Sequence, residues 1–276
     1  IWTQLDGGNP TALYKIGLSD FTTFSPFNIP GVTNIDWEDI AQDGNYIYVG
    51  DFGNNANGNR TDLKIYRVSK SSIMLETPEV DVINFSYEDQ TDFSPQGGNN
   101  TDFDCEAFLV TDTSIFLFTK EWISKETTVY SLPKTPGTYS AVNEGGFDVD
   151  GLITGATYLE NENFVALSGY SAQLIPFMYL LYDYSGNDFF GGNKRKIGLN
   201  LPFHQVEGIA TRDGINFYVS NEFFSDVIII PPKLHTYNLS SVLGYTTSGN
   251  ATNFSDPNTW IGGEIPPDGA DLVIKH

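Results

Sequence analysis

The sequence contains one cysteine, few basic residues and no long apolar run. Cys105 lacks a second cysteine, which excludes a disulfide framework within the chain, and its apolar surroundings predict a buried thiol. Because no stretch of 18 apolar residues occurs, no membrane span is predicted. Lysine and arginine number 14 against 35 aspartates and glutamates, and the formal net charge of −21 argues against nucleic acid as a partner. The same charge favours solubility and cation binding.

What the sequence does have is typical of strands and turns. Its 276 residues include 27 glycines and 14 prolines, and 14% are aromatic. Extended apolar-periodic helical stretches are few, so we predict an all-β fold. The length suffices for one large β domain with a full core.

A weak internal repeat organises the chain. Each copy starts with a short apolar strand, and a second strand follows about ten residues later. The four starts are Asp36–Ala41, Asp104–Leu109, Leu152–Thr157 and Gln205–Ala210. Aligned on Glu38, Glu106, Thr154 and Glu207, they are spaced by 68, 48 and 53 residues. Repeats of this length, with several strands each, are typical of a β-propeller.

The N-terminus matches a repeat without its first strand. Ile1–Asn9 corresponds to a second strand and its loop, and Leu13–Ile16 to a third strand. With the four other copies this predicts five blades over residues 1–242, whereas a six-bladed form would need a blade from the tail or from residues 70–102. The blade that lacks a strand exposes an unpaired edge.

Residues 243–276 contain no further repeat and form a predicted C-terminal β tail. Its last segment, Asp271–His276, reads as a strand. This strand could close the incomplete first blade of its own chain, or it could pair with a neighbouring subunit. The second alternative predicts a homo-oligomer or a fibre formed by strand addition. The tail could also be the start of a further module.

Carboxylates are expected to converge at the propeller axis. Glu38, Glu106 and Glu207 occupy equivalent positions on the predicted inner strands, where like charges persist if a cation or a basic side chain neutralises them. Oxygen ligands without a histidine or cysteine cluster favour Ca²⁺. Lys120 is a candidate counter-ion. Alternatively, each glutamate pairs with neighbouring backbone amides or with side chains at strand ends and locks the blades together.

Two other features are candidates for a site. The loop from Asp51 to Arg60 carries several oxygen side chains and is either a second Ca²⁺ site, with Asp51 as a ligand, or an ordinary turn-rich loop. His204 precedes the fourth inner strand and is either a general base or a structural hydrogen-bonding residue.

The runs Asn34–Ala41 and Tyr48–Asn55, followed by Arg60, resemble secreted propeller proteins of the Bacteroidota, many of which carry a type IX secretion signal. The resemblance covers roughly residues 1–240 and implies a secreted or cell-surface protein. Glu207-Gly208 is distantly similar to the gluconolactonase- and paraoxonase-like propellers, which hold a divalent metal at the centre. That similarity implies a metal role for Glu207 and for Asn221, while Thr154 departs from the pattern.

Two functions follow from these observations. The first is a non-catalytic extracellular protein for adhesion, glycan binding or self-assembly, with Ca²⁺ as a structural ion. The alternative is a metal-dependent hydrolase or lactonase that uses Glu207, Glu38, Glu106 and Asn221. Sequons for glycosylation, which would apply in a host that glycosylates, occur at Asn59, Asn99, Asn238, Asn250 and Asn253.

Overall fold

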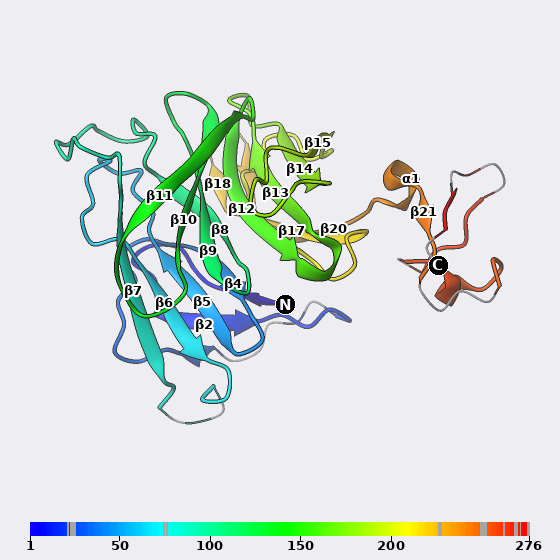
Figure 1. Cartoon of the computed structure of the whole chain (residues 1–276), viewed down its shortest axis with the longest axis horizontal. Coiled ribbons are helices and arrows are strands. Elements are labelled where there is room, and N and C mark those ends of the chain that lie inside the picture. The colour runs from blue at the N-terminus through cyan, green and yellow to red at the C-terminus, as the bar shows by residue number, and fades with distance from the viewer. Residues whose placement is uncertain are drawn as a thin grey trace.

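The computed structural model of the chain consists almost entirely of strands and turns, which confirms the all-β prediction (Figure 1). It describes residues 1–20, 22, 26–73, 75, 77–225, 228–248, 253–261, 263–267, 270 and 272–274. Helical turns in these ranges are α1 (Ser240–Leu243), η1 (Glu160–Glu162) and η2 (Pro257–Thr259). None of the described helices is long and apolar enough to cross a membrane.

Three copies of the repeat each fold into an antiparallel meander of four strands. The first contains β4 (Trp37–Gln42), β5 (Tyr46–Asp51), β6 (Lys64–Ser69) and β7 (Val80–Tyr87). The second contains β8 (Cys105–Val110), β9 (Ser114–Thr119), β10 (Glu126–Pro133) and β11 (Gly137–Asp148). The third contains β12 (Leu152–Leu159), β13 (Phe164–Tyr170), β14 (Pro176–Tyr182) and β15 (Asn193–Gly198).

The two remaining sheets of the body have three strands each in the described residues. The fourth copy forms β16 (Val206–Thr211), β17 (Asn216–Asn221) and β20 (Lys233–Asn238). A small hairpin of β18 (Phe224–Ser225) and β19 (Ile229–Ile230) connects β17 to β20. The N-terminal sheet contains β1 (Trp2–Thr3), β2 (Ala12–Lys15) and β3 (Phe27–Asn28), in agreement with the predicted partial copy.

The sheets are arranged around a common centre, as in a β-propeller. Their first strands pack against one another in sequence order: β4 on β8, β8 on β12, and β12 on β16. All six residues of β8 are buried because the strand has neighbours on both faces, whereas the edge strand β20 is mostly exposed or half-buried. This order brings the starts of the four inner strands to one end of the molecule, which we call the start face.

Apolar cores fill the spaces between adjacent sheets. Phe52 and Phe108 meet edge-to-face, with ring centroids 5.3 Å apart, between the first and second four-stranded sheets. Phe164 and Phe217 join the third sheet to the fourth copy. Each fully buried aromatic or large aliphatic side chain contributes about 1.5–3 kcal/mol to folding. These cores hold the inner strands in place around the centre.

The longest of the described strands was not predicted. β11 is a long, mostly exposed outer strand that pairs with β10 and also, in parallel, with β7 of the preceding sheet. The two sheets thereby become one sheet of eight strands. The sequence of β11 contains glycines and charged residues and shows little apolar alternation, so it gives no clear strand signal. The four inner strands β4, β8, β12 and β16 lie within two residues of their predicted positions.

The tail forms a small unit beside the body (Figure 1). Its β22 (Leu272–Val273), the described part of the predicted terminal strand, pairs in parallel with β21 (Tyr245–Thr246). Within the described residues it therefore completes a pair inside the tail and does not pair with β1. Closure of the first blade by this strand is not the arrangement seen in this structure.

Candidate functional site

The four residues that define the repeat all lie in β-bulges. The pairing register shifts between Trp37 and Ile40, between Cys105 and Ala107, between Ile153 and Gly155, and between Val206 and Ile209. The intervening residues include Glu38, Glu106, Thr154 and Glu207. A bulge leaves its extra residue out of the ladder and redirects the side chain. The repeat in the sequence is thus a repeat of bulges at the start of each inner strand.

Glu106 forms a buried ion pair with Lys120, which confirms the predicted counter-ion. Lys120 Nζ lies 2.5 Å from Glu106 Oε2, and both side chains are at least 95% buried. The ammonium also lies 4.8 Å from the centre of the Trp122 ring and 5.3 Å from that of Tyr170. Burial alone would lower the pKa of Lys120, but the charges of Glu106 and Glu207 outweigh it and hold this pKa well above its usual value.

Glu207 is a second carboxyl beside this pair. Burial raises its pKa well above the usual range, and the charge of Glu106, together with a side-chain hydrogen bond between the two carboxyls, acts in the same direction. Lys120 opposes the shift. Glu222, which follows β17, also has a raised pKa through burial, again opposed by Lys120. Three carboxyls therefore share one ammonium group, an arrangement that favours retention of a proton.

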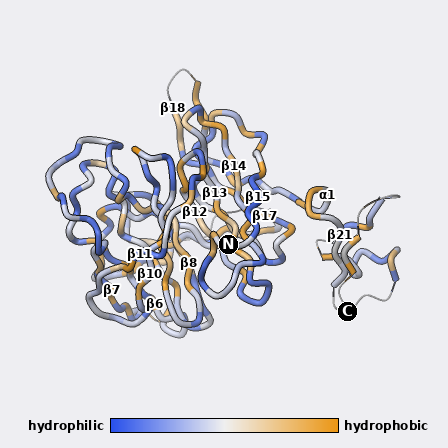
Figure 2. Tube along the Cα trace, turned by 45° about the horizontal axis from the view of Figure 1, so that its top comes forward, coloured by the Kyte–Doolittle hydropathy of each residue, from blue (hydrophilic) through white to orange (hydrophobic). Residues whose placement is uncertain are grey.

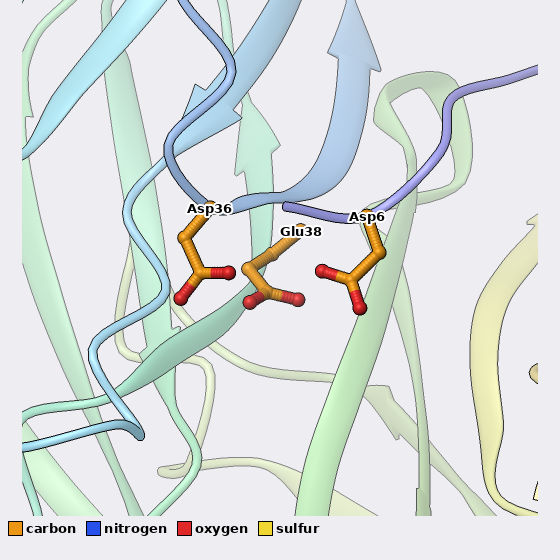
Figure 3. Close-up of side chains that lie close together, drawn as sticks. All are labelled: Asp6, Asp36 and Glu38. Carbon is orange, nitrogen blue, oxygen red and sulfur yellow. The ribbon is translucent and has the colours of Figure 1, made fainter. Parts of the chain in front are cut away.

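A separate group of three carboxylates lies where the N-terminal segment meets β4 (Figure 3). Asp6, Asp36 and Glu38 each offer an oxygen, and these oxygens lie within 4.8 Å of one another. Asp36 and Glu38 are half-buried and Asp6 is exposed. None of the three is in an ion pair with a described basic side chain. Hard cations bind oxygen ligands, so this group is a candidate cation site of the chain.

The electrostatics of this group indicate repulsion that is only partly relieved. Burial, followed by the charge of Asp6, raises the pKa of Asp36 to about 6, and the charge of Arg60 acts against this shift. The pKa of Glu38 is raised well above its usual range, first by burial and then by the charge of Glu106. The residue Glu38 is half-buried, but its carboxyl lies deep enough in the protein to lose most of its hydration, which is why burial raises its pKa. A Cβ on Gly53 would collide with the carboxylates of Glu38 and Asp36, so glycine leaves room for them.

Asp51, which was predicted as a ligand, lies outside this group of three. Its carboxylate is fully buried, lies 3.0 Å from Arg60 Nη2 and accepts a hydrogen bond of 3.0 Å from the backbone nitrogen of Asp36. In the same loop, Asn54 accepts from the Arg60 backbone nitrogen and donates to Phe103 O. These bonds hold the loop in shape and position Asp36.

Asn221 also has bonded partners. Its Nδ2 donates to the carbonyl oxygens of Glu222 (2.7 Å) and Pro231 (3.1 Å), and its Oδ1 lies 2.9 Å from His235 Nε2. The amide therefore supports the backbone of Glu222. Thr154 Oγ1 donates to Val206 O at 2.5 Å, which ties β12 to β16. His204 is half-buried; its ring lies 5.4 Å from that of His235 and its Nδ1 is 3.0 Å from Pro202 O.

The sequons differ in accessibility. Asn99, Asn238 and Asn253 are exposed, Asn59 is half-buried, and Asn250 lies outside the described residues. Their glycosylation remains a prediction.

Sequence reasoning did not single out Asp6, Asp36, Tyr170 or Glu222 as site residues. For Tyr170 and Glu222 the sequence held a signal. Each occupies the position in its repeat that Lys120 occupies in the second copy, directly after the residue of the second strand that pairs beside the bulge. Asp36 stands two residues before Glu38 in the repeat itself. Asp6 comes from a segment whose position beside β4 depends on the fold.

No protein-family model and no curated protein match the chain. Among solved structures, an exo-β-1,3-galactanase from Phanerochaete chrysosporium, crystallised with β-1,3-galactotriose, is similar with a TM-score of 0.49 and 13% identity. The match covers 72% of this chain and 46% of the galactanase, so the chain spans less than half of that protein. A periplasmic gluconolactonase from Pseudomonas aeruginosa is similar with a TM-score of 0.42 and 9% identity, over 87% of this chain and 69% of that one. At TM-scores below 0.5, neither likeness supports an inference about activity.

Proposed function

We propose that this protein is a non-catalytic propeller of five blades that binds Ca²⁺ through Asp6, Asp36 and Glu38. The observation that supports it is the approach of three carboxylate oxygens to within 4.8 Å without a basic partner among the described residues. Such a group is stable when a cation neutralises it or when it holds protons. Ca²⁺ accepts six to eight oxygen ligands in flexible geometry, and water or backbone oxygens would complete the shell.

The bound cation would have a structural role. Asp6 belongs to the N-terminal segment, whereas Asp36 and Glu38 belong to the start of the next blade, so one ion would join the two. Gln4 Nε2 already donates to Glu38 O across this junction at 2.7 Å. A secreted or cell-surface location, where millimolar Ca²⁺ is available, is part of the proposal, and so is a role in adhesion or glycan binding. The net charge of −21 is compatible with both.

Calcium titration followed by thermal unfolding tests this site. At a concentration 100 times the Kd, an ion adds about 2.7 kcal/mol to stability. For a protein of this size that corresponds to a rise in Tm of about 5–10 °C. We expect the rise in the native sequence and its loss in the double variant Asp36→Asn, Glu38→Gln.

A matched control is Asp92→Asn, which removes an exposed turn carboxylate that is not one of the three proposed ligands. It should keep the full calcium response. The proposal would be contradicted if Ca²⁺ left the Tm of the native protein unchanged, or if the double variant showed the same rise in Tm with Ca²⁺.

The second candidate is a hydrolase or lactonase, and the group around Glu106 favours it. Glu207 with a raised pKa could act as a proton donor beside Glu106, whose negative charge Lys120 stabilises. Two carboxyls in unequal environments can supply a general acid and a general base. In this alternative the calcium site would support the reacting centre.

Turnover of a panel of lactones and esters, with and without Ca²⁺, separates the two candidates. If the alternative holds, Glu207→Gln should reduce kcat by about 10²–10⁴-fold, the usual contribution of a general acid. The control Glu126→Gln changes an exposed carboxylate at the start of β10 and should keep full activity. Turnover that disappears only in Glu207→Gln would overturn the non-catalytic assignment, and a calcium-dependent Tm without any turnover would argue against the hydrolase.

A further inference from the structure

Large apolar side chains are exposed on the start face, beside the central carboxylates. Ile175, Phe203, Phe223 and Ile229 are 49–72% exposed. We call these four residues the apolar rim. Single exposed apolar residues are ordinary, but a group on one face marks an interaction site. The hairpin of β18 and β19, which carries part of the rim, stands at the upper edge of the body in Figure 2, where orange marks its hydrophobic residues.

The loops of the rim are held together by defined contacts. Phe203 N donates to Leu174 O at 2.8 Å, which joins the β13–β14 turn to the segment before β16. Both residues have positive φ, 65° for Phe203 and 56° for Leu174. Bulky side chains rarely adopt this conformation, and where they do the surrounding structure imposes it, most often at functional sites. The segment is therefore fixed in a conformation that leaves Phe203 half exposed.

The same segment contacts the base of the β18–β19 hairpin. Glu222 N donates to Gln205 O at 3.1 Å, and the rings of His204 and His235 lie 5.4 Å apart. Phe223 directly follows Glu222. The segments that carry the rim are therefore joined to one another.

Carboxylates lie directly next to the rim. Glu222 precedes Phe223, and the charge of Lys120 acts on it, but no described basic side chain lies within 4.0 Å of its carboxylate. Gln205 Nε2 donates to the hydroxyl of Tyr170 at 3.2 Å, and Tyr170 faces Lys120 near Glu106 and Glu207. Three carboxyls here share one lysine, so the centre of the face attracts positive charge.

We propose that the start face binds a peptide segment of a partner protein that carries a lysine or arginine a few residues from an aromatic or large aliphatic side chain. The apolar side chain packs on the rim, and the basic side chain approaches Glu222 at the centre. Charge complementarity argues for this occupant, because a net charge of −21 steers basic partners towards the protein. An apolar anchor next to a charged contact supplies both affinity and orientation. The inference does not depend on the calcium site.

A random hexapeptide library on an array, probed with the labelled full chain, tests this surface. We expect the bound peptides to be enriched in lysine or arginine together with phenylalanine, leucine or isoleucine. The strongest hexapeptide should lose affinity about tenfold or more in the double variant Phe203→Ser, Ile229→Ser. Glu222→Gln should weaken binding about fivefold and reduce its salt dependence.

The control is Leu75→Ser, because Leu75 is 56% exposed in the turn between β6 and β7, at the other end of the strands. It should bind the peptide as the native sequence does, and a circular dichroism melt of each variant checks its fold. No enriched peptide, or binding that ignores the rim variants, would overturn the proposal. Binding of a glycan on an array, lost in the rim variants, would also overturn the proposal. If peptides bound only after deletion of residues 244–276, the tail would be the occupant of the rim, and the proposal would again be wrong.

Discussion

At the scale of single residues, Lys120 decides the chemistry of the centre. It is buried among Glu106, Glu207 and Glu222, and is the cation that these carboxyls share. A buried ion pair adds little net stability, because desolvation offsets the attraction between the charges. Removing one partner is costly, since the other charge is left buried and unpaired.

We expect Lys120→Met to destabilise the fold by about 3–5 kcal/mol, the cost of breaking a buried ion pair on one side. The double variant Lys120→Met, Glu106→Gln should recover a large part of this loss, because no unpaired charge remains. Urea unfolding of the native protein, the two single variants and the double variant measures both the loss and the recovery in unfolding free energy. Equal losses in Lys120→Met and in the double variant would show that Lys120 acts through packing alone.

At the scale of elements, side-chain bonds tie neighbouring inner strands together. Asp39 of β4 accepts a hydrogen bond of 3.1 Å from Phe108 N of β8, and burial raises its pKa to about 8. Thr154 links β12 to β16 through Val206 O. The alternative predicted for the repeat assigned the locking of the blades to the glutamates, whereas Asp39 and Thr154 make these two contacts.

The bond from Thr154 can be removed without a change of shape. Thr154→Val should cost about 1–2 kcal/mol, because Val206 O loses its donor in a buried position. Thr138→Val, an exposed position of β11, provides the comparison and should stay within about 0.5 kcal/mol of the native stability. Urea midpoints at constant m-value report the difference. A Thr154→Val variant as stable as the comparison would mean that the strand contact does not need the hydroxyl.

The order of elements was predictable from the sequence, and so was Lys120 as a counter-ion of the central carboxylates, but the other side-chain contacts of the site were not. Alternation and turn residues located the strands, and the spacing of Glu38, Glu106, Thr154 and Glu207 placed them at equivalent positions. β11 was missed because it is an outer strand whose sequence shows little apolar alternation. Asp6 reaches Asp36 and Glu38 only through the folded arrangement of the sheets. The amide of Asn221 bonds His235 because a hairpin follows β17, a connection that the repeat does not encode.

At the scale of the whole molecule, negative charge should make stability depend on pH. Burial raises the pKa of Asp36 to about 6 and that of Asp39 to about 8, and also raises the pKa of Glu38 and Glu207. A carboxyl with a raised pKa binds its proton more tightly in the folded state than in the unfolded one. Its contribution is therefore present at low pH and is lost as pH rises through the folded pKa.

Without Ca²⁺ we thus expect Tm to fall as pH rises from 5 to 8. Calorimetry in the presence of a chelator measures the slope, and the variant Asp36→Asn, Glu38→Gln should flatten it. Added Ca²⁺ should raise Tm more at pH 8 than at pH 5, because protons compete with the ion for the carboxylates. A Tm that rises with pH in the chelator would contradict the raised pKa values.

The bulge at the start of each inner strand assigns strand pairing and side-chain presentation to different residues. Residues on either side of it maintain the sheet, while Glu38, Glu106, Thr154 and Glu207 stand outside the ladder. Glu38 and Glu207 can therefore be changed while the ladder stays intact, whereas Glu106 and Thr154 also hold Lys120 and Val206 in place. The same local deviation thus serves the centre in some blades and the attachment of neighbouring strands in others.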